Sequence, residues 1–331
     1  MKIPRGMFNN LRISWYTISC VRIFMGGCAM DYRLFLEKTR PVQKELGLLQ
    51  NEPMHHHTTF QIGGAAEIFV RPRNLGAFMT ALQAARESNA PLTVIGRGSN
   101  LLVKDAGVPG IVLCTCGMNG VRVEGRRVIA EAGATMAQFA QAALHAGLTG
   151  AEFAAGIPGT IGGGVFMNAG AYDGQMADIV TRSVFMDEEG GSRVLCGAEH
   201  AFGYRGSIYK EHPGWVIIEI ECVLKPGDPA EIRAKMEEFS RRRREKQPLN
   251  FPSAGSTFKR PQGYFAGRLI EDAGLKGASV GGAQVSEKHA GFIINHGGAT
   301  CAEVTALIEQ VQQTVFKKFG VRLECEVRLI G

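Results

Sequence analysis

The most informative stretch of the sequence is AEFAAGIPGTIGGGVFMNAGAY, residues Ala151–Tyr172. It combines a corner rich in glycine and proline with three adjacent glycines, Gly162, Gly163 and Gly164. Because glycine has no Cβ, the backbone there can adopt positive φ and lie against a flat or anionic ligand, and a helix is a poor location for such a run. A short helix that begins near Thr160 would, however, offer its free N–H groups to a phosphate. A tightly packed turn or a glycine-rich hairpin is the alternative.

A second glycine loop lies within Val94–Val103, VIGRGSNLLV. Apolar residues lead into and out of the loop, which predicts a strand, a loop and a second strand. Backbone N–H groups at Gly98, Ser99 and Asn100 are suited to an anion. The loop lacks the Gly-Lys-Ser/Thr of a P-loop and does not fit the G-x-G-x-x-G dinucleotide fingerprint. Two such loops in one chain indicate a long ligand that carries a diphosphate.

The composition is that of an ordinary globular protein. The 331 residues suffice for two or three domains, and 45% of them are hydrophobic and 21% charged. The net charge of +6 fits an anionic small ligand as well as nucleic acid. The basic runs, of which residues 241–244 are the densest, contain no interleaved aromatic residues, so we expect no nucleic-acid partner. No apolar run approaches the length of a transmembrane helix, and we expect no membrane partner.

Cysteine and histidine usage predicts neither disulfides nor a metal site. The eight cysteines show no C-x-x-C pair and no zinc-type spacing, so we expect buried, reduced thiols and a reducing, cytoplasmic location. The run His55–His57 has no evident carboxylate or cysteine partner and is expected to lead into a strand that starts at Thr58. The cysteines are Cys20, Cys28, Cys114, Cys116, Cys196, Cys222, Cys301 and Cys325.

Residues 1–29 fit the remainder of the chain least well. Basic residues precede an apolar patch, but Arg22 interrupts what would have to be an unbroken signal-peptide core. Met30 opens a segment with the pattern of an amphipathic helix. We therefore expect translation to start at Met25 or Met30 rather than Met1, and residues 1–29 to be a non-native or disordered extension.

The pattern beyond this extension mixes helices and strands and predicts an α+β fold that begins with a small β-α-β lobe. Helices are expected at about 74–88, 136–146, 230–246 and 302–319. Strands are expected at 66–70, 92–95, 101–103, 111–116, 121–124, 127–132, 180–186, 192–195 and 215–224.

Three further stretches carry polar residues that a fold alone does not require. Arg205 lies between an aromatic residue and a glycine in FGYRGS, and Ser256 follows a glycine in PSAGSTFKR. In LECEVR, alternation would direct Glu324 and Glu326 to the same face of a strand. The structural alternatives are a surface ion pair for Arg205, a helix N-cap for Ser256 and an edge-strand charge for Glu326.

Taken in order, these motifs resemble those of the flavin-dependent UDP-N-acetylenolpyruvoylglucosamine reductases, also called UDP-N-acetylmuramate dehydrogenases. The resemblance runs from about His57 to Gly331 and leaves the N-terminal extension out. The short interval between YRGS and PSAGS resembles the subgroup that lacks an inserted loop with a substrate-capping tyrosine. The matching motifs are TTFQIGG, GRGSNLLV, AGIPGTIGGGVFMNAGAY, YRGS, QP, PSAGSTFKRP, AGRLIEDAGLKG, KHAGFIIN and LECEVRLIG.

The resemblance implies a two-lobed FAD-binding domain of the vanillyl-alcohol-oxidase (PCMH) type plus a C-terminal α+β substrate-binding domain. The lobes would span residues 30–116 and 117–229, and the substrate-binding domain residues 230–331, with a last strand that returns to the FAD domain. It further implies non-covalent FAD, NADPH as hydride donor, a UDP-sugar substrate in peptidoglycan precursor synthesis, a cytoplasmic location and a monomer.

The resemblance assigns catalytic roles to Arg205, Ser256 and Glu326, and the chemistry asks for these residue types independently. Hydride addition to an enol ether needs the charge that develops on the adjacent carboxylate to be stabilised, which a guanidinium does as a fixed, always-charged fork. The resulting enol must be protonated from one face by a positioned acid such as a serine hydroxyl. A glutamate can orient the arginine, orient a water or bind the intermediate, and the sequence does not separate these roles.

The remaining candidate residues concern the cofactor and the nucleotide. A flavin alcohol oxidase of the same fold is the rival function, but the three catalytic candidates have no clear role in it, and neither loop contains a His or Cys to anchor FAD. A nucleotide-binding module without activity would leave Ser256 and Glu326 unexplained. The cofactor candidates are Gly96, Arg97, Gly98, Ser99, Asn100, Leu101, Gly156, Pro158, Gly159, Gly162, Gly163, Gly164, Asn168 and Ala169; the substrate candidates are Tyr204, Lys246, Lys259 and Arg260.

Overall fold

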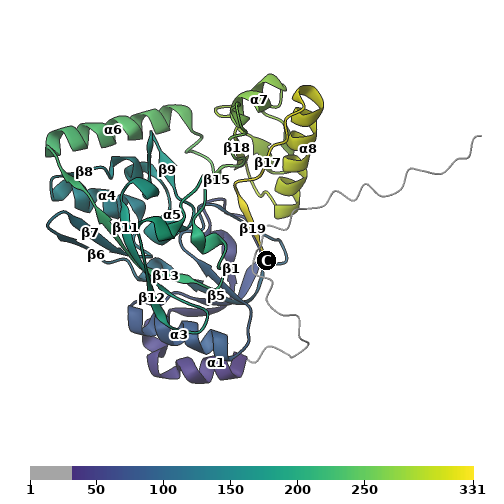
Figure 1. The fold of residues 1–331 in the computed structure, drawn as a ribbon. Helices are drawn as coiled ribbons and strands as arrows, with labels where there is room; N and C mark the ends of the chain where they lie inside the picture. The colour runs from purple at the N-terminus through teal and green to yellow at the C-terminus, as the bar shows by residue number, and fades with distance from the viewer. Residues whose placement is uncertain (1–31) are drawn as a thin grey trace, which may run out of the picture.

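The computed structural model describes residues 32–331, which form two lobes and a C-terminal unit in chain order (Figure 1). We call residues 32–117 lobe 1, residues 118–246 lobe 2 and residues 247–327 the C-terminal unit. The expectations for residues 1–29, for Met25 and Met30 as start sites and for Cys20 and Cys28 lie outside the described residues. In the described part, no helix is both long enough and apolar enough to cross a membrane.

Lobe 1 contains a four-stranded sheet in the order β1-β2-β5-β3, with α1 and α3 packed together beneath it (Figure 1). Its elements are α1 (Tyr32–Thr39), α2 (Gln43–Leu46), β1 (Leu48–Pro53), β2 (Ala65–Val70), α3 (Leu75–Glu87), β3 (Leu92–Ile95), β4 (Leu101–Val103) and β5 (Val108–Cys114), with 3-10 helices η1 (Arg40–Val42), η2 (Met54–His57) and η3 (Thr115–Gly117). The three strands β2, β5 and β3 run parallel. The expected helix at 74–88 is confirmed: the Asn74 side chain caps it by accepting a hydrogen bond from Ala77 N at 2.9 Å.

Three expectations for lobe 1 are wrong. No strand starts at Thr58. The histidine run forms the 3-10 helix η2 after β1, and the next strand is β2, which begins at Ala65. His57 Nε2 is 2.8 Å from Glu52 Oε1, so a carboxylate is in fact nearby. Among residues 32–331 no three His, Cys, Asp or Glu side chains are grouped to hold a metal ion. The amphipathic helix expected after Met30 stops at Thr39, since Pro41 follows and the chain continues as a 3-10 turn.

Lobe 2 is built on a five-stranded antiparallel sheet in the order β12-β11-β13-β7-β6. Its strands are β6 (Val121–Glu124), β7 (Arg127–Glu131), β8 (Leu148–Thr149), β9 (Gly170–Ala171), β10 (Gly174–Gln175), β11 (Val180–Met186), β12 (Ser192–Cys196), β13 (Val216–Val223) and β14 (Lys225–Pro226); its helices are α4 (Met136–His145), η4 (Glu152–Gly156), α5 (Ile161–Phe166), η5 (Met176–Asp178), η6 (Gly197–His200), η7 (Ile208–Lys210) and α6 (Pro229–Lys246). Buried apolar side chains of β7, α4, α5 and β13 share one core, which fixes α5 against the sheet.

The C-terminal unit packs a second antiparallel sheet, in the order β15-β18-β17-β16, against two helices. Its elements are β15 (Ser253–Ser256), α7 (Ala266–Asp272), β16 (Ser279–Val280), β17 (Ala283–Val285), β18 (Phe292–Asn295) and α8 (Cys301–Phe319), followed by β19 (Arg328–Ile330). The apolar stripe expected on α8 is buried, including Val304, Leu307 and Val311. β19 leaves the unit and pairs in parallel with β4 of lobe 1, with Arg328 opposite Leu101.

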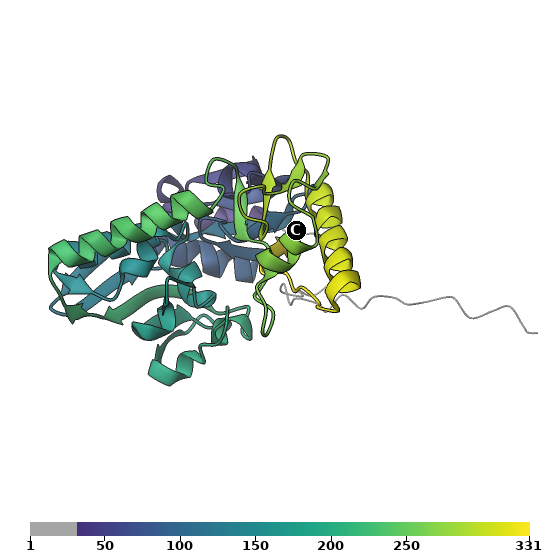
Figure 2. The same ribbon diagram turned by 90° about the horizontal axis from the view of Figure 1, so that it is seen from above.

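The long helix α6 packs on lobe 2. The family resemblance had instead placed this helix in the substrate-binding domain, with a boundary at residue 230. Its buried residues Ile232 and Phe239 face lobe 2, and Met236 contacts the lobe 2 core. Seen from above, the green α6 extends across lobe 2, away from the yellow α8 (Figure 2). Lys288 of the C-terminal unit donates to the carbonyl of Arg244 at 2.5 Å, near the end of α6. We propose that the C-terminal domain begins after Lys246.

The described cysteines are all free, but not all are buried as expected. Cys114, Cys222 and Cys301 are buried, whereas Cys196 is exposed. Cys196 is the last residue of the edge strand β12, most of which is exposed, so no core covers its thiol.

Candidate active site

The two glycine loops lie against each other, although about sixty residues separate them in the sequence. A Cβ added to Gly96 would stand 2.3 Å from Thr160 Oγ1, and one added to Gly159 would stand 3.4 Å from Ser99 Oγ. The first loop joins β3 to β4, and the second leads from η4 into α5. The parallel pairing of β3 with β5 and the N-cap of α5 at Thr160 fix their ends. One ligand can therefore contact both loops.

The run of three glycines forms a helix, which corrects the expectation that a helix is a poor location for it. Gly162, Gly163 and Gly164 lie in α5 and none of them has positive φ. Thr160 caps this helix by accepting a hydrogen bond from Gly163 N at 3.3 Å. The glycines serve close packing: a Cβ on Gly162 would stand 2.9 Å from the Ala132 carbonyl oxygen, and one on Gly164 2.8 Å from Met136 Sδ. Gly163, between them, is exposed.

Alanine substitutions at Gly162 and Gly163 are expected to have different effects, the first on stability and the second on cofactor binding. Gly162→Ala should lower the free energy of unfolding by about 1–3 kcal/mol, because overpacking against the Ala132 backbone forces α5 away from the sheet. Gly163→Ala adds a methyl group that meets nothing closer than 3.4 Å, so the fold should keep its stability while the dissociation constant for FAD rises. Denaturant unfolding and FAD titration of both variants measure the contrast. Equal stability of the two would contradict this account of α5.

Two buried polar atoms beside these loops lack a hydrogen-bond partner among the described residues, and both suit a bound anionic cofactor. They are Thr58 Oγ1 and Arg243 Nε. Thr58 borders Gly98, and the Arg243 side chain lies 3.4 Å from the position of a Cβ on Gly156. Burial lowers the pKa of the Arg243 guanidinium from its ordinary value. Because an unpaired buried donor is costly, a ligand with phosphate oxygens fits this place.

The side chains of two predicted cofactor residues are engaged with the protein. Asn168, at φ 44°, donates to the Gly203 carbonyl at 3.0 Å and accepts from Ala177 N at 2.9 Å. Asn100 donates to the Glu326 carbonyl at 3.1 Å. The Asn168 amide thus holds the chain that precedes Arg205, and the Asn100 amide holds the chain at Glu326. The side-chain NH2 groups of both residues are therefore engaged with the protein.

Arg205 stands at the tip of a tight turn between Gly203 and Gly206. These two glycines exchange backbone hydrogen bonds at 3.0 and 3.3 Å. Arg205 has φ 56°, a left-handed conformation that usually favours glycine or asparagine. Lys210 reinforces the turn by donating to the Arg205 carbonyl at 2.5 Å. Such strain in a non-glycine residue is typical of positions whose side chain must point in one direction.

The three catalytic candidates converge from lobe 2 and the C-terminal unit. Arg205 Nε donates to Glu326 Oε1 at 2.7 Å, and both side chains are partly buried. Glu326 N donates to the carbonyl of Thr257, the residue that follows Ser256, at 2.8 Å. Ser256 is exposed at the end of β15, directly after Gly255 with φ 78°. Arg205 and Glu326 are therefore in contact, and a backbone hydrogen bond holds Glu326 against the residue that follows Ser256.

Two alternatives and one prediction for these residues are wrong. Ser256 ends a strand and does not cap a helix. Arg205 is not a surface ion pair, since its side chain is only 27% exposed. Glu324 and Glu326 do not share the face of a strand, because 321–327 is irregular apart from a single bridge at Cys325. Glu324 is exposed and pairs with Lys259 at 2.9 Å.

The charges around Glu326 are mostly positive. Burial raises the pKa of the Glu326 carboxyl above its ordinary value, although Arg205, Lys210 and Lys259 act in the opposite direction. Burial also lowers the pKa of the Lys210 ammonium, to which the charges of Arg328 and Lys259 contribute. This cluster has more cations than carboxylates, so it is suited to an anionic substrate.

The raised pKa of Glu326 predicts a pH-dependent contribution to stability. In the folded protein the carboxyl keeps its proton to a higher pH than in the unfolded chain, so wild type should lose stability relative to Glu326→Gln as pH rises from about 4.5 through the raised pKa. Denaturant unfolding of both proteins between about pH 4 and pH 7 measures this difference. A difference that grows in favour of wild type with rising pH would mean that the folded state favours the ionised carboxylate.

Three of the predicted substrate residues lie near Arg205 and Glu326, and the fourth, Lys246, lies at the end of α6. Tyr204 OH accepts a hydrogen bond from Arg260 N at 3.0 Å, and Lys259 N donates to the Glu324 carbonyl at 2.8 Å, so three of the four border the catalytic candidates. Lys246 is exposed at the end of α6, without a described contact to them.

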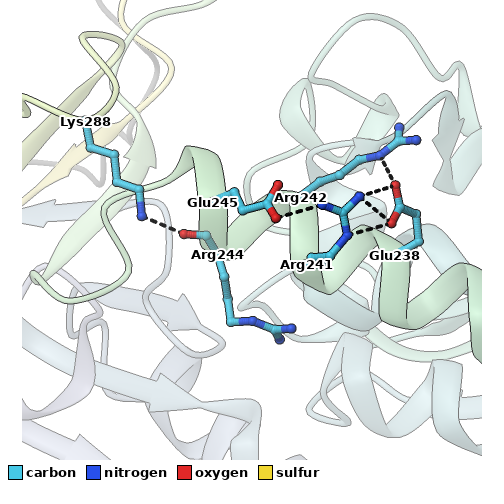
Figure 3. A network of polar contacts seen from close by, with 6 residues as sticks. All are labelled: Glu238, Arg241, Arg242, Arg244, Glu245 and Lys288. Atoms are coloured by element: carbon cyan, nitrogen blue, oxygen red, sulfur yellow. Dashed lines mark hydrogen bonds and ion pairs between the residues drawn. The ribbon is translucent and has the colours of Figure 1, made fainter.

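The arginine run on α6 does not form one phosphate-binding cluster. Figure 3 shows Arg241 and Arg242 turned toward Glu238. Their guanidinium nitrogens donate to the Glu238 carboxylate at 2.7–2.9 Å, and Arg241 also donates to Glu245 at 2.7 Å. The Arg244 side chain points away from these carboxylates (Figure 3). These exposed ion pairs contribute little to stability. Of the four arginines, Arg243 is the one whose side chain lies at the glycine loops, beside Gly156.

The structure adds residues that the sequence interpretation missed. Lys210 holds the Arg205 carbonyl, and the Arg328 guanidinium lies 4.6 Å from the ring centroid of Phe166 at the end of α5. No periodic pattern marks either residue, since the first depends on the single turn η7 and the second on the pairing of β19 with β4. A cavity of about 350 Å³ lies beneath α6 and is lined by Glu152, Tyr172, Lys235 and Phe239, among others, but by none of the catalytic candidates.

Comparison with known proteins identifies two family models along the chain. Residues 247–330 match the model for the UDP-N-acetylenolpyruvoylglucosamine reductase C-terminal domain. Residues 66–197 match the model for an FAD binding domain. The two matches correspond to the C-terminal unit with β19 and to most of the two lobes, which establishes an FAD-binding domain of two lobes followed by an α+β domain.

Whole-length relatives carry one name. The chain is 47% identical over 298 residues to the UDP-N-acetylenolpyruvoylglucosamine reductase of Caldanaerobacter subterraneus, covering 90% of this chain and 98% of that protein. It is 49% identical over 287 residues to that of Pediococcus pentosaceus, covering 87% and 95%. The crystal structure of the Thermus caldophilus UDP-N-acetylenolpyruvylglucosamine reductase superposes with a TM-score of 0.73 at 34% identity, covering 86% of this chain and 99% of that one.

Proposed function

The chain belongs to the UDP-N-acetylenolpyruvoylglucosamine reductase family, and we propose that it reduces UDP-N-acetylglucosamine enolpyruvate to UDP-N-acetylmuramate with NADPH and bound FAD. The product would serve peptidoglycan precursor synthesis in the cytoplasm, and the enzyme would act as a monomer. The observation that carries the proposal is the contact of Arg205 with Glu326, whose backbone N–H is hydrogen-bonded to the residue that follows Ser256.

The loops of lobes 1 and 2 are the proposed FAD site. The backbone of Gly96–Asn100 and of Gly156–Gly159 would bind the diphosphate. The N-terminal turn of α5 and Arg243, whose Nε lacks a partner, would contribute positive charge. Bound FAD would accept hydride from NADPH and deliver it to the terminal carbon of the enolpyruvyl group. Neither loop contains a histidine or cysteine, which supports non-covalent binding.

The three catalytic candidates would act on the substrate. The Arg205 guanidinium would pair with the enolpyruvyl carboxylate and stabilise the negative charge that develops there. The Ser256 hydroxyl would donate a proton to the carbon next to that carboxylate. Glu326 would hold the guanidinium in place through the 2.7 Å hydrogen bond to Nε, which leaves the two Nη groups for the substrate.

Two measurements on the purified protein test this function. The protein should show a flavin absorbance spectrum, and FAD should be released intact by denaturation. NADPH oxidation under anaerobic conditions should depend on UDP-N-acetylglucosamine enolpyruvate. A flavoprotein that consumes O₂ with an alcohol substrate and ignores the UDP-sugar would be an oxidase, and a protein that binds no flavin would contradict the proposal altogether.

A further inference from the structure

Three buried polar side chains lie together in lobe 2, next to the segment that carries Arg205. Ser183, His200 and Tyr209 are each 0% exposed, and we call them the Ser183 cluster. Ser183 Oγ lies 2.7 Å from His200 Nε2 and 2.7 Å from Tyr209 OH. Buried polar groups destabilise a fold unless they are hydrogen-bonded, and a fully bonded set of them specifies one arrangement of the chain.

The directions of these hydrogen bonds follow from the partners. His200 Nδ1 is 2.9 Å from the Gly197 carbonyl, which can only accept, so Nδ1 carries the proton. Burial lowers the pKa of the His200 imidazole, which keeps the ring neutral at neutral pH and leaves Nε2 as an acceptor. The Ser183 hydroxyl therefore donates to Nε2, and its oxygen accepts from Tyr209. Burial raises the pKa of the Tyr209 hydroxyl to about 12, so this donor keeps its proton.

The two partners of Ser183 flank Arg205 in the chain. His200 ends η6, five residues before Arg205, and Tyr209 lies in η7, four residues after it. Residues 201–206 include none that is buried, so the chain leaves the core after His200 and returns just before Tyr209. We call residues 201–208 the Arg205 loop. Its two ends are joined through the hydroxyl of Ser183.

Ser183 is a firm point of attachment for this loop. It lies in β11, which pairs with β12 on one side and with β13 on the other, and it stands opposite Leu195 and Ile220. Strands inside a sheet are among the last parts of a fold to open. The Ser183 cluster therefore ties both ends of the Arg205 loop to a part of lobe 2 that stays formed.

Two further hydrogen bonds attach the loop to α5 and to the residues that follow it. The Asn168 amide donates to the Gly203 carbonyl at 3.0 Å, and Ser207 Oγ donates at 3.0 Å to the carbonyl of Phe166, the last residue of α5. A loop attached on one side alone can pivot about that side. Attachment to both α5 and the sheet fixes the direction in which its tip points.

We propose that Ser183 is a positioning residue for Arg205, because its hydroxyl joins the two ends of the Arg205 loop. The guanidinium has to meet the substrate carboxylate while its Nε donates to Glu326 at 2.7 Å. A misplacement of about 1 Å in such a group can cost about 10²-fold in rate. This inference rests on the proposed function, since it assumes that Arg205 binds the enolpyruvyl carboxylate.

Ser183→Ala in the FAD-loaded enzyme tests the inference, with Ser88→Ala as its matched control. Ser88 is also a buried serine, but its hydroxyl donates to the Ala85 carbonyl at 2.9 Å in lobe 1. Stopped-flow absorbance of the flavin follows each half-reaction. Ser183→Ala should slow reduction of the enolpyruvyl substrate about 10–10²-fold, because the Arg205 loop loses its anchor on the sheet. Flavin reduction by NADPH should stay nearly unchanged, and Ser88→Ala should match wild type in both half-reactions.

A double-mutant cycle separates positioning of Arg205 from a general loss of order. Adding Ser183→Ala to Arg205→Gly should slow substrate reduction little further, because the group to be positioned is already absent. Tyr209→Phe keeps the hydrogen bond between Ser183 and His200, so it disturbs the fold less and should slow substrate reduction by only about threefold to tenfold. Effects of Ser183→Ala and Arg205→Gly that multiply in the double variant would overturn the inference.

Hydrogen exchange measured by mass spectrometry gives a readout that does not depend on catalysis. Peptides that cover residues 197–210 should exchange their amide hydrogens faster in Ser183→Ala than in wild type or Ser88→Ala. Unchanged exchange in this segment would overturn the inference, even with a lower rate of substrate reduction. A wild-type enzyme that does not reduce the enolpyruvyl UDP-sugar would contradict the proposed function, whereas faster exchange in Ser183→Ala would still show that Ser183 holds the Arg205 loop.

Discussion

Replacing Ser256 with alanine is expected to slow reduction of the enolpyruvyl substrate by about 10²–10⁴-fold, the range that a positioned general acid contributes. Flavin reduction by NADPH should stay nearly unchanged, because that half-reaction needs no proton at the substrate carbon. The hydroxyl is exposed at the end of β15 and carries no described hydrogen bond that the fold would lose. Stopped-flow absorbance of the flavin measures the two half-reactions separately.

Ser253 provides a control for this substitution on the same strand. Ser253→Ala removes a hydroxyl three residues earlier in β15 and should leave both half-reactions intact. Ser256→Ala and Ser253→Ala should also unfold at the same denaturant concentration as wild type. Equal losses in the two half-reactions of Ser256→Ala would argue against Ser256 as the acid.

Removing the Arg205 guanidinium is expected to slow substrate reduction by about 10²–10³-fold, as loss of one donor to a developing negative charge does. Arg205→Gly is the suitable variant, because φ at this position is 56° and glycine adopts that conformation without strain. The turn from Gly203 to Gly206 should then persist. The pKa of Glu326 should rise further, since Arg205 acts to lower it. Stopped-flow absorbance of the flavin measures the loss of rate.

Added guanidinium ion distinguishes a catalytic Arg205 from a structural one. It should restore part of the substrate reduction rate of Arg205→Gly, and it should leave flavin reduction by NADPH unaffected. Arg205→Lys keeps one charge but loses the planar fork, so it should recover only a small part of the rate. Full activity of Arg205→Lys would show that a point charge suffices and that the contact of Nε with Glu326 has no role.

Much of the fold could be predicted because its helices carry a strong periodic signal. α3 and α8 begin and end within one residue of the expected bounds, since an apolar stripe and a capping residue mark both. β1 was missed because Leu48–Pro53 is an edge strand in which no residue is buried, without alternation and with a proline at its end. The glycines of α5 were judged unsuited to a helix because of their low helix propensity. Their helix is instead stabilised by packing against Ala132 and Met136, which local propensity does not reveal.

The motifs predicted which residues belong to the site but not how these residues come together. Resemblance selected Arg205, Ser256 and Glu326, but their convergence depends on β19 returning to β4 of lobe 1, across more than two hundred residues. The roles of Asn100 and Asn168 as holders of the Glu326 and Arg205 segments follow from contacts that no local pattern encodes. Lys210 was missed for the same reason.

The central claim is that the glycine loops hold FAD so that its ring faces Arg205, Ser256 and Glu326 together. A crystal structure of the FAD complex with the enolpyruvyl UDP-sugar tests it most directly. The account predicts the diphosphate of FAD between the Gly96–Asn100 loop and α5, and the substrate carboxylate on the Arg205 guanidinium with the Ser256 hydroxyl beside the neighbouring carbon. A flavin ring bound elsewhere, with these three side chains remote from the substrate, would contradict it.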